Sequence, residues 1–172
     1  MTGYVEQWAN RKDLAAFLKR ERPDIKNPKT FHFASLDKGK DGQAQDDAGY
    51  VSLRLPCRVK LIIWILRDEA DLDIEYTMGI ATGVNTTFLS VGGDDFVKAL
   101  VDTTTYLGGL ANPPLVMTTS YGDDEDNFAA KDAKKICNGY MALGARGVSV
   151  ICASGDVYLS VRRINSLNVD FS

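Results

Sequence analysis

Segments with the composition of β-strands alternate with segments of helical periodicity along most of this chain, and this alternation limits its fold more than any other feature. Strands are predicted at 4–7, 31–36, 86–91, 115–120 and 147–153, and helices at 11–22, 68–81, 95–107 and 129–143. In the second helix Leu72, Tyr76 and Ile80 recur every four positions, and Ala70, Ile74 and Met78 add to the apolar face. The alternation predicts an α/β fold with a parallel sheet, right-handed crossovers and flanking helices.

Length and composition exclude several classes of protein. The 172 residues, 45% of them hydrophobic, are enough for one domain with a core. The net charge is -3, and acidic residues interrupt the basic stretch Arg11–Arg22, so no nucleic-acid partner is expected. The longest apolar run, Leu61–Leu66, is too short to cross a bilayer, and the N-terminus lacks the pattern of a signal peptide. We therefore expect a soluble protein with no membrane partner.

The cysteines and glycines predict no metal or nucleotide site. Cys57, Cys137 and Cys152 are far apart and form no C-x-x-C pair. Their odd number is compatible with a reducing compartment, with an unpaired buried thiol, or with a molecule that lacks part of itself. The glycine pairs match neither a P-loop nor a dinucleotide-binding motif, so no cofactor is predicted.

Hydrolytic chemistry in such a sheet would need a general base. The single histidine, His32, lies in a predicted strand between two phenylalanines, where a structural role is favoured, and no G-x-S-x-G motif is present. Glu69 and Asp73 are four residues apart and share one face of a predicted helix. In a cleft, repulsion and desolvation would raise one carboxyl pKa and suit the pair to acid/base work at low pH. A solvated surface pair is the alternative.

Two further segments follow predicted strands directly. Asp156 comes just after the last strand, at the carboxyl edge of the sheet where ligands bind, although it could instead cap a helix. The segment Ser120–Gly122 ends the preceding strand and would flank the same cleft. The acidic run Asp123–Asp126 lacks the spacing of a calcium loop, which favours a solvated turn.

These residues, in this order, resemble the sedolisin family of serine-carboxyl peptidases, which includes the tripeptidyl peptidases, and most closely its fungal secreted members. The segment Glu69–Asp73 resembles the family's E-x-x-x-D helix, and Val116–Asp123 and Gly144–Asp156 resemble two further family blocks. Gly3–Asn10 resembles the first strand of the mature domain. The resemblance covers about 3–49 and 69–156.

The resemblance implies a subtilisin-like parallel sheet flanked by helices, here truncated, and a peptide or protein substrate. It assigns Glu69 as general base, Asp73 as the residue that orients and polarises Glu69, and Asp156 as a protonated donor in the oxyanion hole. The strand edge that pairs with the substrate backbone would be formed by Ser120, Tyr121 and Gly122. It also implies an extracellular protein, and we expect a monomer.

The chain departs from the family in ways that bear on activity. The family's nucleophile lies in a G-T-S-A motif that this sequence does not contain, and the family's calcium loop also lies further along the chain. We therefore interpret 1–156 as part of a catalytic domain, without cofactor and inactive alone, the alternative being a non-catalytic peptide-binding α/β remnant. Residues 50–68 are interpreted as an insertion and 157–172 as an unrelated tail, and translated intron sequence is our hypothesis for both.

Overall fold

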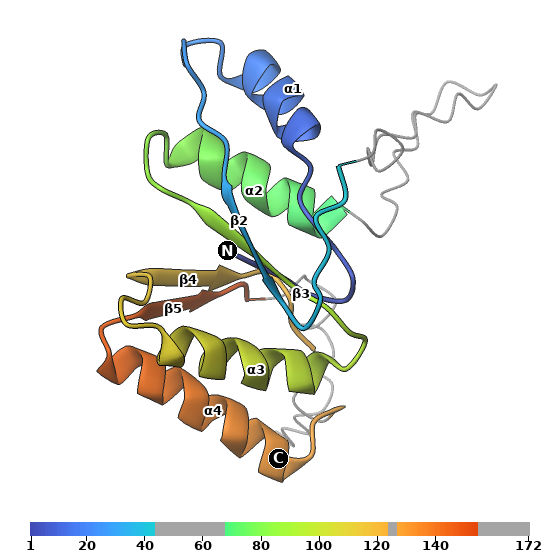
Figure 1. Ribbon diagram of the computed structural model, residues 1–172, viewed down its shortest axis with the longest axis vertical. Coiled ribbons are helices and arrows are strands. Elements are labelled where there is room, and N and C mark those ends of the chain that lie inside the picture. Colours follow the sequence, from blue (N-terminus) through green and yellow to red (C-terminus); the bar gives the residue numbers. More distant parts are fainter. Residues whose placement is uncertain (44–67, 124–126, 155–172) are drawn as a thin grey trace, which may run out of the picture. The chain divides into compact units, whose positions relative to one another are not determined.

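The computed structural model describes residues 1–43, 68–123 and 127–154, in which helices alternate with strands (Figure 1). Every strand pair among these residues is parallel, which confirms the predicted α/β class. The described strands form two hydrogen-bonded sheets rather than the one sheet predicted. The described residues fall into two compact units that divide after Thr103.

The first unit contains a three-stranded sheet in the order β1-β3-β2. Its strands are β1 (Thr2–Gly3), β2 (His32–Leu36) and β3 (Thr87–Val91). The central strand β3 pairs with β2 along its whole length, and Phe88 and Val91 are completely buried. Their burial follows from position, since a central parallel strand is covered on both faces.

Helices α1 (Arg11–Glu21) and α2 (Asp68–Ile80) pack against each other and end within one residue of the predicted bounds. The Asn10 side chain caps α1 by accepting a hydrogen bond from the Lys12 N–H at 2.8 Å. The two helices share a core with the sheet, formed by Ala9, Leu14, Leu18, Phe31, Ala70, Ile74, Met78 and Phe88.

Only part of the predicted apolar face of α2 is buried. Its core positions are Ala70, Ile74 and Met78, which are at most 3% exposed. The other predicted apolar stripe is exposed: Leu72 by 38%, Tyr76 by 55% and Ile80 by 80%. The two stripes are two residues apart, about 200° around the helix, so only one can face the sheet. The smaller Ala70 lies on the buried face, where the helix approaches the core closely.

The predicted strand at 4–7 is wrong, because β1 ends at Gly3. Val5 and Glu6 have φ of 56° and 58°, in the left-handed region that no extended strand adopts. The Gln7 N–H closes this turn on the Tyr4 carbonyl oxygen at 3.1 Å. The Tyr4 side chain is fully buried, its ring lies edge-on to Phe96, and its hydroxyl donates to Thr103 Oγ1 at 3.2 Å.

The second unit contains the parallel pair β4 (Val116–Thr119) and β5 (Ser149–Cys152) and the helix α4 (Ala130–Ala145), which contacts β5. Helix α3 (Phe96–Gly109) spans the division between the units.

Two predictions for the second unit need correction. Helix α4 continues through Gly144, and the glycine with a left-handed φ of 83° is Gly147. Strand β5 is not continuously buried, since Ile151 is 55% exposed, because α4 covers only one face of this two-stranded sheet.

Several predictions fall outside the described residues. These concern the tail 157–172, Cys57 and the interpreted insertion up to residue 67. The last residue of that interpreted insertion, Asp68, is described and is the first residue of α2. In the part of the chain that is described, no helix has both the length and the apolar character needed to cross a membrane.

Candidate active site

The first two turns of α2 carry the predicted acid pair. Glu69 and Asp73 are four residues apart on a continuous helix, which places their β-carbons about 5–6 Å apart on one side. Both side chains are half-buried, and Asp73 Oδ2 has no solvent contact. The Met1 ammonium group interacts electrostatically with Asp73. Burial lowers the pKa of this ammonium group, and the Asp73 carboxylate opposes that shift.

A residue that the sequence analysis did not identify attaches this part of α2 to the rest of the unit. Asp71 Oδ1 accepts a hydrogen bond from the Asn10 backbone N–H at 2.6 Å. Asn10 is only 1% exposed, and it is also the residue that caps α1. The Asn10–Asp71 hydrogen bond therefore joins the start of α1 to the helical turn between Glu69 and Asp73. The only sequence signal for this role is a third acid inside the E-x-x-x-D spacing.

The carboxyl edge of the three-stranded sheet is built from close backbone contacts. A β-carbon on Gly39 would lie 2.0 Å from the Ser90 carbonyl oxygen, and one on Gly92 would lie 2.3 Å from the Asp37 carbonyl oxygen. Asp37 itself has a φ of 50°. Only glycine permits such close approach of two main chains, so Gly39 and Gly92 set the path of the loops that follow β2 and β3.

Lysine–carboxylate pairs hold these loops together. Lys98 Nζ donates to Asp37 Oδ2 at 2.9 Å and also to Asp102. The hydrogen bond from Lys98 lowers the pKa of Asp37, and the two carboxylates raise the pKa of Lys98. Nearby, hydrogen bonds from Lys40 first, and from a backbone N–H second, lower the pKa of Glu6.

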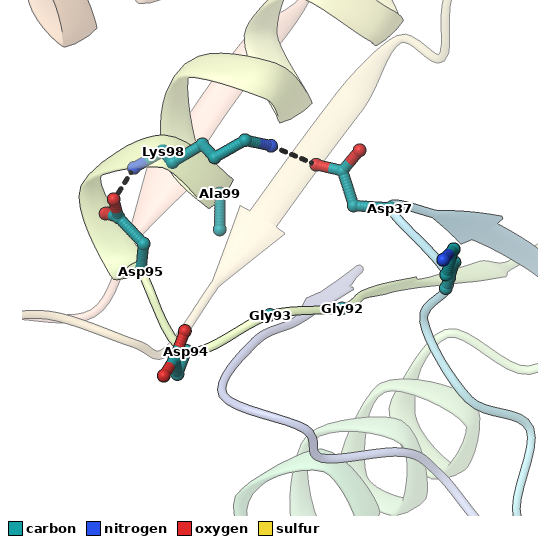
Figure 2. Close-up of a pocket in the computed structure, with 8 residues that line it drawn as sticks. Asp37, Gly92, Gly93, Asp94, Asp95, Lys98 and Ala99 are labelled. Atoms are coloured by element: carbon teal, nitrogen blue, oxygen red, sulfur yellow. Dashed lines mark hydrogen bonds and ion pairs between the residues drawn. The ribbon is translucent and has the colours of Figure 1, made fainter.

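A pocket of about 350 Å³ opens between the loops at this edge (Figure 2). Figure 2 shows Lys98 extending across it to Asp37, while the Asp95 carboxylate caps α3 by accepting the Lys98 backbone N–H at 2.9 Å. The pocket is lined by Asp37, Lys38, Gly92, Gly93, Asp94, Asp95, Lys98 and Ala99. The predicted catalytic residues are not among the residues that line it.

The predicted substrate-binding segment follows β4 in the second unit. The Thr119 carbonyl oxygen accepts the Ala153 N–H at 3.0 Å, which is the end of the pairing with β5. Beyond it, Ser120 and Tyr121 are half-buried and Gly122 is exposed. The Tyr121 N–H turns back to Thr119 Oγ1 at 3.3 Å. This segment leaves the sheet at a carboxyl edge, as predicted.

Glu69 and Asp73 thus lie together on one helix of the first unit. The segment Ser120–Gly122 belongs to the second unit. Asp156 lies outside the described residues. His32 is exposed and is the first residue of β2, so it lies at the amino edge of the sheet, away from the carboxyl edge. This position argues against His32 as a catalytic base.

Neither thiol chemistry nor a metal centre is indicated by the described residues. Cys137 and Cys152 are exposed free thiols, and partial burial raises the pKa of Cys152. Within the described ranges, no three or more histidine, cysteine, aspartate or glutamate side chains come together as a metal site would require.

Curated proteins similar to this chain are tripeptidyl peptidases. Tripeptidyl-peptidase SED4 of Arthroderma otae is 30% identical over 171 residues, which cover 91% of this chain and 25% of the relative. Probable tripeptidyl-peptidase SED4 of Trichophyton verrucosum is 29% identical with the same coverage. Probable tripeptidyl-peptidase SED3 of Arthroderma benhamiae is 29% identical over 91% of this chain and 26% of the relative. No family model matches the chain. The chain spans about a quarter of the length of these relatives.

Proposed function

We propose a peptidase function for this chain, which is a relative of the tripeptidyl peptidases of the sedolisin family. In this proposal the chain is the part of a serine-carboxyl peptidase catalytic domain that supplies the acid/base carboxylates. Its substrates are peptides or proteins, it acts at acid pH as an extracellular monomer, and a longer polypeptide supplies the nucleophilic serine.

The observation that carries the proposal is the half-buried pair Glu69 and Asp73 on the first two turns of α2. We infer that carboxyl groups at this spacing share a proton over part of the acid range. One ionised and one protonated carboxyl group is the state that a general base and its orienting partner require. The Asn10–Asp71 hydrogen bond supports the proposal, because it holds this turn of α2 in a defined place.

In the proposed mechanism Glu69 accepts the proton of the serine hydroxyl as the serine attacks the scissile carbonyl, and later returns that proton to the leaving amine. Asp73 hydrogen-bonds to Glu69 and orients it. The protonated Asp156 donates to the oxyanion, which requires acid pH. The backbone of Ser120–Gly122 pairs with the substrate chain as an added strand.

Residues 1–172 on their own are proposed to hydrolyse no peptide, because they contain no G-T-S-A motif and without a nucleophile the covalent half of the mechanism cannot occur. A second function, peptide binding without cleavage, is favoured by the segment Ser120–Gly122. It leaves the sheet just beyond the Thr119–Ala153 hydrogen bond, at the carboxyl edge of a parallel sheet, where such sheets bind ligands.

Two measurements test the proposal. The first treats the full chain with a fluorophosphonate probe and with fluorogenic tripeptide amides at several acid pH values, and we expect neither labelling nor cleavage. The second replaces the corresponding segment of tripeptidyl-peptidase SED4 of Arthroderma otae with residues 1–156 of this chain, and we expect acid peptidase activity.

In that chimera Glu69→Gln should abolish activity by orders of magnitude in kcat, and Glu75→Gln is the matched control. Glu75 lies on the same helix, six residues further along and about 240° around the axis from Glu69. Equal activity in the two variants would show that Glu69 is not the base. Binding of a peptide by the unmodified chain without cleavage would favour the second function.

A further inference from the structure

An acceptor sequence for a covalent modification begins in the loop between α2 and β3. Residues Asn85, Thr86 and Thr87 form N-x-T with no proline at the middle position, and no other N-x-S or N-x-T occurs in the 172 residues. This is the tripeptide that carries N-linked oligosaccharides in secreted eukaryotic proteins. A sequence match alone is weak, so the position of the tripeptide in the fold decides its value.

Asn85 and Thr87 are both exposed, and Asn85 lies in the loop just ahead of β3. Gly83, two residues earlier, has a left-handed φ of 86° and nothing within 4 Å of a β-carbon placed on it. The loop therefore faces open space. The backbone on its other side is held firmly, because the Thr86 carbonyl oxygen accepts the His32 N–H at 2.8 Å. Asn85 is itself exposed, so a group on its side chain can extend into solvent.

Two exposed aliphatic side chains precede Asn85 in the chain. Ile80 is 80% exposed at the end of α2, and Val84 is 58% exposed immediately before Asn85. Exposed aliphatic side chains of this kind favour association between chains. A hydrated oligosaccharide on Asn85 would hinder contact between other molecules and the adjacent Val84.

The modification is also compatible with the candidate active site. Asn85 lies at the amino edge of the three-stranded sheet, because Thr87 is the first residue of β3. Glu69 lies at the opposite end of α2, about 16 Å along the helix axis from Ile80. A glycan on Asn85 would therefore leave Glu69 and Asp73 accessible.

We propose that Asn85 is an N-glycosylation site. The co-reactant is an oligosaccharide linked through its first N-acetylglucosamine to a lipid diphosphate. The Asn85 side-chain nitrogen forms a bond to C1 of this sugar while the bond from C1 to the diphosphate oxygen breaks. The amide nitrogen loses one proton, the lipid diphosphate departs with the bonding electron pair, and no atom changes oxidation state. This inference goes beyond the proposed peptidase activity and requires only entry into a eukaryotic secretory pathway.

The test uses the full chain behind a cleavable secretion leader, translated in the presence of microsomes that glycosylate. We expect one band shift that an amide-cleaving glycosidase removes, leaving aspartate at position 85 in the peptide mass spectrum. The shift should be lost in Asn85→Gln and in Thr87→Ala, and retained in Thr87→Ser, which preserves the acceptor tripeptide. Because transfer occurs during translation, the result does not depend on whether a variant folds.

Asn112→Gln is the matched control, since Asn112 is also an exposed asparagine outside the helices and strands but is followed by proline. This variant should be glycosylated like the original chain. An unmodified original chain in this assay, or a shift that persists in Asn85→Gln, would overturn the proposal. Neither result bears on catalysis, so the glycosylation and peptidase proposals fail separately.

Discussion

Replacing Asp71 by alanine removes the hydrogen bond that joins α2 to the start of α1. The acceptor is a carboxylate oxygen 2.6 Å from the Asn10 backbone nitrogen, and Asn10 is only 1% exposed. A hydrogen bond to a charged group contributes about 1.5–3 kcal/mol, and a buried N–H left without an acceptor is costly. We therefore expect Asp71→Ala to lower the free energy of unfolding by about 2 kcal/mol. Asp71→Asn keeps an oxygen acceptor and should lose about half as much.

Urea unfolding followed by the fluorescence of Trp8 measures this change. Trp8 packs against the core of the first unit, and a Trp64→Phe background leaves it as the only tryptophan. For a slope of about 2 kcal/mol per molar urea, the midpoint should fall by about 1 M. Hydrogen exchange should also rise more in the first turn of α2 than in its last, because the bond acts at the N-terminal end of the helix.

Asp94→Ala is the matched control, because the exposed Asp94 carboxylate lies in a loop of the same unit. It should change the free energy of unfolding by less than about 0.5 kcal/mol. If both variants move the midpoint equally, the Asn10–Asp71 hydrogen bond does not hold α2. If Asp71→Ala unfolds at lower urea without faster exchange in the first turn, the bond stabilises the unit but does not position the acid pair.

Four further variants test the packing and the ion pairing of the fold. Gly39→Ala should destabilise the first unit by more than about 2 kcal/mol in urea unfolding, because the new β-carbon would lie 2.0 Å from a backbone oxygen. Gly108→Ala is its control, because Gly108 lies in a helix with open space around it, and this variant should stabilise the protein by up to about 1 kcal/mol. Equal effects would contradict this account. Tyr4→Phe should cost about 1 kcal/mol in the same assay, because it removes the buried hydrogen bond to Thr103, and an unchanged midpoint would show that the bond contributes nothing. Lys98→Met should destabilise at neutral pH. The pKa of Asp37 is lowered below its ordinary 3.8 in the folded chain, so the contribution of this pair is present above that value and is lost as the pH falls through the lowered pKa. The difference between the two proteins should therefore shrink in urea titrations below about pH 4, and a difference that grows there would refute the sign.

Much of the fold was predictable from short stretches of sequence. Helix periodicity, the Asn10 cap and the alternation of strands and helices all act over a few residues, and the described helices and most strands lie close to their predicted bounds. The spacing of Glu69 and Asp73 places both on one side of a helix, whatever surrounds that helix.

Contacts between distant residues decided the rest. The sequence contains two apolar stripes on α2, and only packing against the sheet shows that Ile74 is buried and Ile80 exposed. The turn at Val5 and Glu6 ended a strand that local composition predicted.

The Asn10–Asp71 hydrogen bond joins residues 61 positions apart, and the Lys98–Asp37 pair spans the same separation. Local sequence patterns report the conformations that a few neighbouring residues prefer, so the sequence alone determined the helices and the acid spacing. Which helix face is buried, and which carboxylate anchors the acid-bearing turn, depends on groups that meet only when the sheet and helices pack together.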